Sequence, residues 1–257
     1  MGEAIIAGLL KSGSYNSDDI QIYEVMKDRR DYIIKTYHVK STDNILDTAD
    51  FGDIVIVAVK PNIVARVLGE IGHKMKPGGV LASIAAGVTL EFLKKHLPRD
   101  VPVVRVMPNL ACSVGEAMIV ICPSENISED ELKLTIDALS GLGKVLKLEE
   151  KYLNLATGLV GSGPAYIFLI IDALADAGVR LGLPKDISIM LAAQTTLGAS
   201  KMVVETGEHP AKLKDMVATP AGTTVEGLLA LEKGKIRATL ISAVTEAALR
   251  AQRLMPT

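Results

Sequence analysis

Up to about Leu148, short runs of apolar and β-branched residues alternate with longer segments of helical period. This alternation is typical of βαβ units, in which helices cover a mainly parallel sheet. The runs predicted as strands are residues 20–25, 53–59, 79–84, 101–106, 117–122 and 144–148. Residues 54–59 and 103–106 are almost continuously apolar, so we expect these two strands to be covered on both faces and to lie centrally in the sheet.

From Glu149 onward the period changes, and helix formers at helical spacing are interrupted only by Gly and Pro. This half of the chain is therefore predicted to be all-helical. The segment 164–181 is apolar on more than one face, which is unusual for a helix that faces water all round. We expect one of these faces to contact a second subunit.

The residues that directly follow the predicted strands are mostly small or turn-forming. An open parallel sheet binds ligands outside the carboxyl ends of its strands, so a ligand is expected at these positions. They are Glu24, Ala58, Val59, Lys60, Pro61, Ala85, Ala86 and Asn109. Each of them taken alone is better explained by ordinary turn chemistry, but their recurrence after successive strands predicts a nucleotide-binding cleft.

The first residues carry the end of a dinucleotide-binding fingerprint. A Rossmann fold places a glycine-rich turn between its first strand and first helix, where backbone N–H groups receive the pyrophosphate. Here Met1 and Gly2 lead directly into an apolar helix, and Glu24 follows about 20 residues later, where a ribose-binding residue is expected. We therefore expect a Rossmann-like sheet whose first strand and front glycines lie upstream of Met1. Adding them is expected to raise the affinity for the cofactor.

The charges near Glu24 leave the choice of nicotinamide cofactor open. Glu24 favours the free ribose hydroxyls of NAD, whereas Lys27, Arg29 and Arg30 favour the additional phosphate of NADP. The predicted cofactor is NADPH or NADH, with NADP slightly favoured.

Composition excludes several classes of partner. Lys and Arg number 28 against 30 Asp and Glu, so no broad basic field is available for nucleic acid or an anionic membrane. Cys112 and Cys122 form no CxxC pair and suit the reducing cytoplasm. The apolar run 165–171 falls well short of the ~20 residues of a membrane span. The four histidines lack metal-ligand spacing, so a cytoplasmic protein with a small-molecule substrate and no metal is predicted.

Short motifs are spread over nearly the whole chain. They are Met1-Gly2-Glu3-Ala4-Ile5, Ala58-Val59-Lys60-Pro61, Ala85-Ala86-Gly87-Val88-Thr89, Arg105-Val106-Met107-Pro108-Asn109, Gly161-Ser162-Gly163-Pro164-Ala165-Tyr166 and Thr219-Pro220-Ala221-Gly222-Thr223-Thr224. Together they resemble the pyrroline-5-carboxylate reductase family, and the last two are the most specific. The resemblance implies a dinucleotide-binding domain at residues 1–150. It also implies an all-α dimerisation and substrate domain at residues 151–257, with a substrate pocket built from both subunits.

The same resemblance implies a reaction and a set of partners. The expected reaction is the NAD(P)H-dependent reduction of 1-pyrroline-5-carboxylate to L-proline, the last step of proline biosynthesis. A homodimer is expected, with assembly into a larger oligomer as a further expectation. Met1, Gly2 and Asn44 join the strand-end residues as predicted cofactor-binding residues.

The predicted catalytic residues centre on the loop before residue 223. Gly222, Thr223 and Thr224 stand at the start of a helix running to about Glu232, whose free N–H groups would seat the substrate carboxylate. The alternative is that Thr223 is only an N-cap. The family's usual Ser-Pro-Gly-Gly loop here reads Thr219-Pro220-Ala221-Gly222, which would strain Ala221 if that position needs a positive φ.

Three further roles are predicted for catalytic side chains. Thr224 is expected to donate a hydrogen bond to the imine or its carboxylate, because an alcohol is too weak an acid to act alone. Ser162 is expected to form a wall of the substrate pocket, or else to cap its helix. Lys60 either assists at the nicotinamide or only covers the end of the sheet.

Two other functions remain open on sequence alone. A β-hydroxyacid dehydrogenase also joins a Rossmann domain to a helical one, but it should carry a catalytic lysine where this chain reads Gly161-Ser162-Gly163-Pro164. A non-catalytic nucleotide-binding protein is the second alternative, motivated by the incomplete fingerprint.

Overall fold

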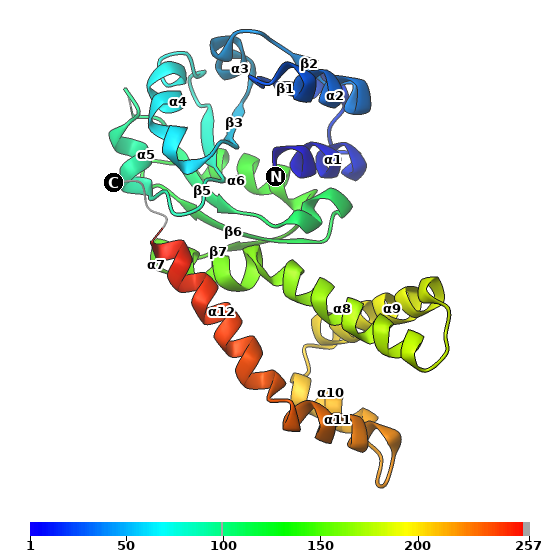
Figure 1. Ribbon diagram of the computed structural model, residues 1–257. Coiled ribbons are helices and arrows are strands. Elements are labelled where there is room, and N and C mark those ends of the chain that lie inside the picture. The colour runs from blue at the N-terminus through cyan, green and yellow to red at the C-terminus, as the bar shows by residue number, and fades with distance from the viewer. Residues whose placement is uncertain (99, 254–257) are drawn as a thin grey trace. The chain divides into compact units, whose positions relative to one another are not determined.

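The computed structural model describes residues 1–98 and 100–253 (Figure 1). It divides into two compact units, one holding Met1–Ser162 with the described residues from Thr245 onward, the other holding Gly163–Val244. The predicted α/β architecture followed by a helical part is confirmed. The predicted boundary between a dinucleotide-binding domain and a substrate domain at residues 150 and 151 stays a prediction, since the division into compact units does not show where either ligand binds.

A five-stranded sheet forms the centre of the first unit. Its order is β3 (Ile54–Val57), β4 (Val80–Ser83), β5 (Val103–Met107), β6 (Ala117–Pro123) and β7 (Gly143–Lys147). All neighbours are parallel except β5 and β6, which confirms the mainly parallel sheet. Every residue of β5 is buried, as predicted for a central strand. The same prediction for β3 was wrong, because in the described chain β3 is an edge strand with alternating burial.

Helices cover both faces of this sheet. Leu81 of β4 packs into a core with α4 (Val64–Ile71) and α5 (Leu90–Lys95), while its neighbours Val80 and Ala82 pack into a core with α1 (Gly2–Ser12). Successive residues of a strand point to opposite faces, so α4 and α5 lie on one face and α1 on the other. The core on the α1 face also takes in Leu139 of α6 (Glu129–Ser140).

A second sheet joins β1 (Gln21–Ile22) to β2 (Lys40–Ser41) in parallel. Sequence reasoning missed β2 because it has only two residues, both polar and exposed. Ile6 of α1 packs with α2 (Lys27–Tyr37) and these strands, while Ala4 and Ile5 face the larger sheet. The helix α3 (Ile45–Phe51) follows β2. Helix α1 therefore connects the cores of the two sheets (Figure 1).

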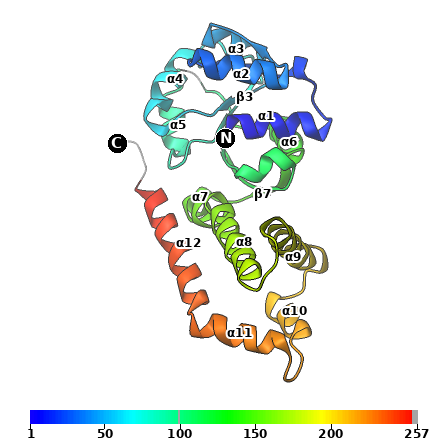
Figure 2. The ribbon, with the colours of Figure 1, turned by 45° about the vertical axis from the view of Figure 1, so that its right-hand side comes forward.

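Helices make up the described chain from Glu150 onward, as predicted. They are α7 (Glu150–Ala156), α8 (Gly163–Arg180), α9 (Lys185–Thr206), α10 (Pro210–Val217), α11 (Thr223–Lys233) and α12 (Ile236–Gln252). Within the second unit α8 and α9 pack side by side (Figure 2), and Lys185 pairs with Asp172 and Asp176. Only Ala175 of α8 is buried, which leaves most of its apolar side chains exposed.

Two helical stretches are long and apolar enough to cross a membrane, by length and composition alone. They span Glu150–Arg180, with 31 residues, and Lys185–Thr206, with 22. Polar and charged residues interrupt both stretches, so uninterrupted apolar runs in the sequence did not predict them. Length and composition do not distinguish such a helix from one whose apolar face contacts another protein chain.

Glu3 connects α1 to α2 through a set of hydrogen bonds. Its carboxylate accepts hydrogen bonds from Arg29, from the Tyr37 hydroxyl at 2.9 Å and from the Tyr32 hydroxyl at 3.3 Å. The hydrogen bond from Arg29 is the largest of the effects that hold the pKa of Glu3 below its usual value. A carboxyl whose pKa is lowered by folding stabilises the fold above its unfolded pKa and loses that contribution as the pH falls.

We therefore expect Glu3→Gln to lower the melting temperature at neutral pH, with a deficit that shrinks as the pH falls below about 4. Melting curves of both proteins at a series of pH values test this expectation. A deficit that stays constant down to low pH would show that the charge of Glu3 adds nothing to the fold.

Candidate functional site

The carboxyl ends of three parallel strands meet at one edge of the larger sheet. The register pairs Val57 with Ser83 and Ser83 with Arg105, so the segments that leave β3, β4 and β5 lie next to one another. Seven of the predicted cofactor-binding residues stand on these segments: Ala58, Val59, Lys60, Pro61, Ala85, Ala86 and Asn109. Their clustering is a property of the fold, while their role in binding stays a prediction.

The segment after β4 is built from small residues. Ala85 is buried, and Ala86 is partly exposed. Gly87 has a φ of 79°, a left-handed conformation that favours glycine. The Thr89 side chain then accepts a hydrogen bond from the Phe92 N–H at 3.1 Å and so caps α5. The result is a short, fixed loop, with little side-chain bulk, at the sheet edge.

The amino end of α1 lies against the segment after β3. A Cβ placed on Gly2 would be 3.5 Å from the Cβ of Ala58. Met1 is the N-cap residue and makes no side-chain cap, so the first N–H groups of α1 are not taken up by a capping side chain. Unpaired amide groups at the positive end of a helix suit an anion such as a pyrophosphate.

The residues predicted to choose between NAD and NADP are partly engaged in local contacts. The Glu24 carboxylate accepts a hydrogen bond from the N–H of Met26 at 3.0 Å. Arg29 and Arg30 pair with Glu3 and Asp43. Within residues 1–98 and 100–253, Lys27 makes no ion pair.

Asn44 caps α3 and thus has a structural role besides its predicted one. Its side-chain oxygen accepts from the Leu46 N–H at 3.1 Å, and its amide group donates to Asp47 at 3.1 Å. A part in cofactor binding stays a prediction for this residue.

The segment after β5 is tied to a π-helical turn, Thr157–Gly161, that follows α7. Asn109 accepts a hydrogen bond from the Ala111 N–H at 3.1 Å and donates to the Val160 carbonyl at 3.2 Å. Ser162 directly follows this turn, and its N–H donates to the Thr157 carbonyl at 3.1 Å. Sequence reasoning missed the turn, because no periodicity separates one wide helical turn from its flanking α-helices. Such turns are frequent at functional sites.

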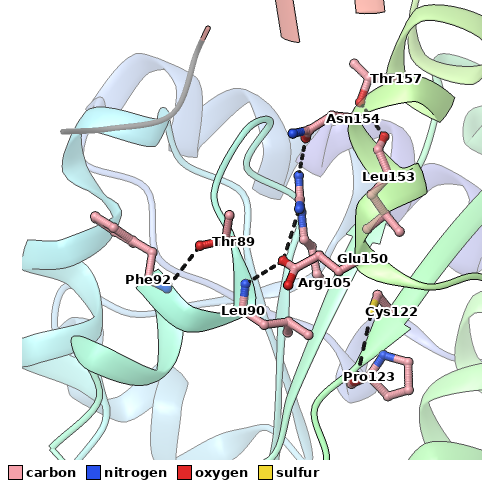
Figure 3. A network of polar contacts seen from close by, with 10 residues as sticks. All are labelled: Thr89, Leu90, Phe92, Arg105, Cys122, Pro123, Glu150, Leu153, Asn154 and Thr157. Atoms are coloured by element: carbon pink, nitrogen blue, oxygen red, sulfur yellow. Dashed lines mark hydrogen bonds and ion pairs between the residues drawn. The ribbon is translucent and has the colours of Figure 1, made fainter. Parts of the chain in front are cut away.

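A buried polar network lies beneath these segments (Figure 3). Arg105 is only 2% exposed in the middle of β5, and its guanidinium donates to Glu150 at 3.1 Å and to Asn154 at 2.6 Å. The same Glu150 oxygen accepts a hydrogen bond from the Leu90 N–H at 2.7 Å. An arginine inside an otherwise apolar strand was the available signal for this network, although sequence reasoning did not use it.

The described residues offer neither a thiolate nucleophile nor a metal centre. Burial raises the pKa of both Cys112 and Cys122, and a protonated thiol is a poor nucleophile. Residues 1–98 and 100–253 contain no group of three His, Cys, Asp or Glu side chains suited to a metal ion.

The second unit carries the predicted catalytic loop at the start of α11. Gly222 is the N-cap, so Thr223 and Thr224 occupy the first turn of the helix, and the alternative interpretation of Thr223 as a cap is wrong. Neither threonine hydroxyl has a hydrogen-bond partner in the described part of the chain. A Cβ on Gly222 would come within 2.4 Å of the Thr219 hydroxyl oxygen and 3.0 Å of the Thr219 carbonyl oxygen, so a larger residue here would push the Thr219 side chain aside.

Ala221 adopts the strained conformation that its place in the loop predicted. Its φ is 59°, in the left-handed region that alanine rarely adopts. The loop therefore keeps the backbone geometry for which glycine is suited, although its residue here is alanine.

Family profiles match both halves of the chain. The profile described as pyrroline-5-carboxylate reductase dimerisation matches residues 150–254. A profile described as NADP oxidoreductase, coenzyme F420-dependent, matches residues 1–87.

Several whole proteins with similar sequences and structures are pyrroline-5-carboxylate reductases. The chain is 40% identical over 255 residues to the pyrroline-5-carboxylate reductases of Synechocystis sp. and of Arabidopsis thaliana. These alignments cover 99% of the chain and 94% and 92% of the two relatives. The structure of a pyrroline-5-carboxylate reductase from Coxiella burnetii matches with a TM-score of 0.88 at 32% identity, covering 100% and 95% of the two chains. The Plasmodium falciparum pyrroline carboxylate reductase, solved with NADP bound, matches with a TM-score of 0.90 at 30% identity and the same coverage.

We expect Ala221→Gly to raise the free energy of unfolding by up to about 1 kcal/mol, because it removes left-handed strain at the cost of some unfolded-chain entropy. Chemical denaturation measures the difference, and Gly222→Ala is the matched control, which should destabilise the loop through its clash with Thr219. A less stable Ala221→Gly protein would contradict the strain assigned to this residue.

Proposed function

Because the chain belongs to the pyrroline-5-carboxylate reductase family, we propose that it uses NAD(P)H to reduce 1-pyrroline-5-carboxylate to L-proline, the last step of proline biosynthesis. The observation that carries this proposal is 40% identity over 99% of the chain to curated enzymes of that name. The clustering of small strand-end residues at one sheet edge supports it. The family's dimerisation profile on the helical half supports it as well.

The residues at the sheet edge fit a dinucleotide. The uncapped first turn of α1 at Met1 and Gly2 would receive the pyrophosphate. Glu24 would accept hydrogen bonds from ribose hydroxyls, and the remaining predicted residues, with Asn44, would line the cofactor. When bound, the reduced nicotinamide supplies the hydride. NADPH remains slightly favoured over NADH in this proposal, with Lys27 as the cation that pairs with no carboxylate in the described chain.

The substrate side of the proposal rests on the start of α11. Free N–H groups after Gly222 would hold the substrate carboxylate, as helix amino ends do for anions. Thr224, which is partly buried, would donate a hydrogen bond to the imine or its carboxylate. Ser162 would form a wall of the pocket, and Lys60 would lie near the nicotinamide or cover the sheet end. Holding two reactants in register contributes roughly 7–11 kcal/mol, so no strong acid is required.

The exposed apolar side chains of the helical half support the family's dimer. The large apolar residues that are most exposed on α8 and α9 include Phe168, Leu169, Leu174, Met190, Leu191, Leu197, Met202 and Val204. A surface of this kind on a single chain marks an interaction site. We propose that a second copy covers it, with residues 1–150 as the dinucleotide domain and 151–257 as the dimerisation and substrate domain. Assembly of dimers into a larger oligomer and a cytoplasmic, membrane-free location belong to the same proposal.

The reaction is tested by mixing the purified chain with NADPH or NADH and 1-pyrroline-5-carboxylate. We expect nicotinamide oxidation that requires the imine, with one proline formed per nicotinamide consumed. Absence of imine-dependent oxidation with both cofactors would contradict the proposed function. Reduction of NAD+ or NADP+ by a β-hydroxyacid, in a separate assay with the oxidised cofactor, would favour the dehydrogenase alternative.

We expect Thr224→Ala to lower kcat about tenfold or more with little effect on nicotinamide affinity, because the lost hydrogen bond belongs mostly to the transition state. Thr224→Ser keeps the hydroxyl and should be nearly harmless. Thr223→Ala should keep its melting temperature, since Thr223 is not the cap. Steady-state kinetics and melting curves on the three variants test this. Wild-type kcat and substrate KM in Thr224→Ala would remove Thr224 from the chemistry.

We expect light scattering to find a dimer at micromolar concentration, because the apolar surface is too large to stay in water. Leu169→Glu, at a position 70% exposed, should weaken the dimer, whereas the control Lys201→Gln on the exposed surface of α9 should not. A stable folded monomer, or co-sedimentation of the wild type with lipid vesicles, would overturn the assignment of this surface to a second copy.

A further inference from the structure

Arg105 carries a buried charge whose partners all come from one helix. It is the third of the five residues of β5, and the strand residues on either side of it are valines. Its guanidinium meets Glu150 and Asn154, which lie four residues apart and so share one face of α7. An ionised group buried in this way has to be paired. The pairing therefore fastens α7 to the middle of the sheet.

Glu150 connects this pair to a third segment. The oxygen that accepts from Arg105 also accepts from the N–H of Leu90, the first residue of α5. Leu90 directly follows the loop with Ala85 and Ala86. One carboxylate oxygen of α7 thus contacts both β5 and the start of α5, where the loop that leaves β4 ends (Figure 3).

Apolar packing links the same two segments. Met107, Val120, Cys122 and Leu153 form a buried cluster, against which Ala86 and Leu90 pack from the loop side and Val160 from the π-helical turn. Asn109 holds that turn by its hydrogen bond to the Val160 carbonyl. The loop after β4 is therefore connected to α7 and the turn before Ser162 in two ways, through the Glu150 carboxylate and through this apolar cluster.

We propose that Arg105, Glu150 and Asn154 are positioning residues, which set the loop at Ala85 and Ala86 in a fixed relation to the turn that presents Ser162. The inference rests on the proposed function, in which the loop faces the nicotinamide and Ser162 faces the substrate. Hydride transfer needs the two reactants in near contact, and a misplacement of about 1 Å can cost about 100-fold in rate. In this proposal the network acts through the two segments that would contact the reactants.

This network sets geometry more than it adds stability. Replacing a buried ion pair by apolar residues of similar volume is often neutral or stabilising. An ion pair in this place is therefore a weak source of stability. An apolar contact would not fix the orientation of α7. Two hydrogen bonds from one planar guanidinium fix both the rotation of α7 about its axis and its position along β5.

Steady-state kinetics with melting curves test the proposal on the purified chain of residues 1–257 in its native assembly. Glu150→Ala removes the shared acceptor, and we expect kcat to fall about tenfold or more. Glu150→Gln keeps an acceptor oxygen for Leu90 and Arg105 and should recover most of kcat. Glu149→Ala is the matched control, because the adjacent Glu149 is exposed and pairs with Lys151 at 2.7 Å. Leu68→Ala, at a buried core position of α4, is the control for lost stability alone.

Asn154→Ala supplies a milder variant if Glu150→Ala does not fold, because it removes one acceptor and leaves the ion pair. Its kcat should fall while its melting temperature stays above that of Leu68→Ala. The proposal is overturned if Asn154→Ala and every folded variant of Glu150 keep the wild-type kcat and lose only stability, as Leu68→Ala is expected to do.

Hydrogen exchange separates a failure of this proposal from a failure of the proposed function. If the wild type shows no turnover, the function is wrong, and the network is still tested by the amides of residues 85–90 and 157–162. Glu150→Ala, or Asn154→Ala in its place, should speed exchange in both segments together. Faster exchange in only one segment, or in neither, would overturn the coupling.

Discussion

The arrangement of the first unit depends on the hydrogen bonds that pair the buried guanidinium of Arg105 at the centre of the sheet. Arg105 is almost inaccessible to solvent, so its charge has to be met by protein groups. Those groups are Glu150 and Asn154, and through them α7 is held on β5 while the same carboxylate holds the start of α5. The loop after β4 and the π-helical turn after α7 are thereby connected to one another through the sheet.

This connection matters because the parallel strands place their exits at one edge. The pairing of β3 with β4 and of β4 with β5 collects the small residues at that edge, and α1 brings its uncapped amino end against Ala58. In the second unit the first turn of α11 presents two threonines without hydrogen-bond partners in the described chain. In the proposed reaction the sheet edge binds the nicotinamide and the start of α11 binds the imine. The main contribution of the protein to the rate is then the orientation of the two reactants.

Sequence reasoning succeeded where the signal is local. Apolar runs identified the strands of the larger sheet, and the loop motif anticipated the left-handed Ala221. It failed where the determinant is distant in the chain. Arg105 and Glu150 are 45 positions apart, so neither residue alone reveals the pair. The π-helical turn and the two-residue β2 contain too few residues to show a hydrophobic period. The edge position of β3 depends on which strands pair, and the hydrophobicity of a strand does not reveal its pairing partners.

The stability and turnover of Arg105→Met test whether the buried charge orients the segments around it. This change removes the deeply buried charge and leaves Glu150, whose side chain is 33% exposed, able to meet water and to accept from Leu90. A role in geometry predicts a melting temperature close to the wild type with kcat lower by about tenfold or more. Wild-type turnover in a stably folded Arg105→Met protein would contradict the account.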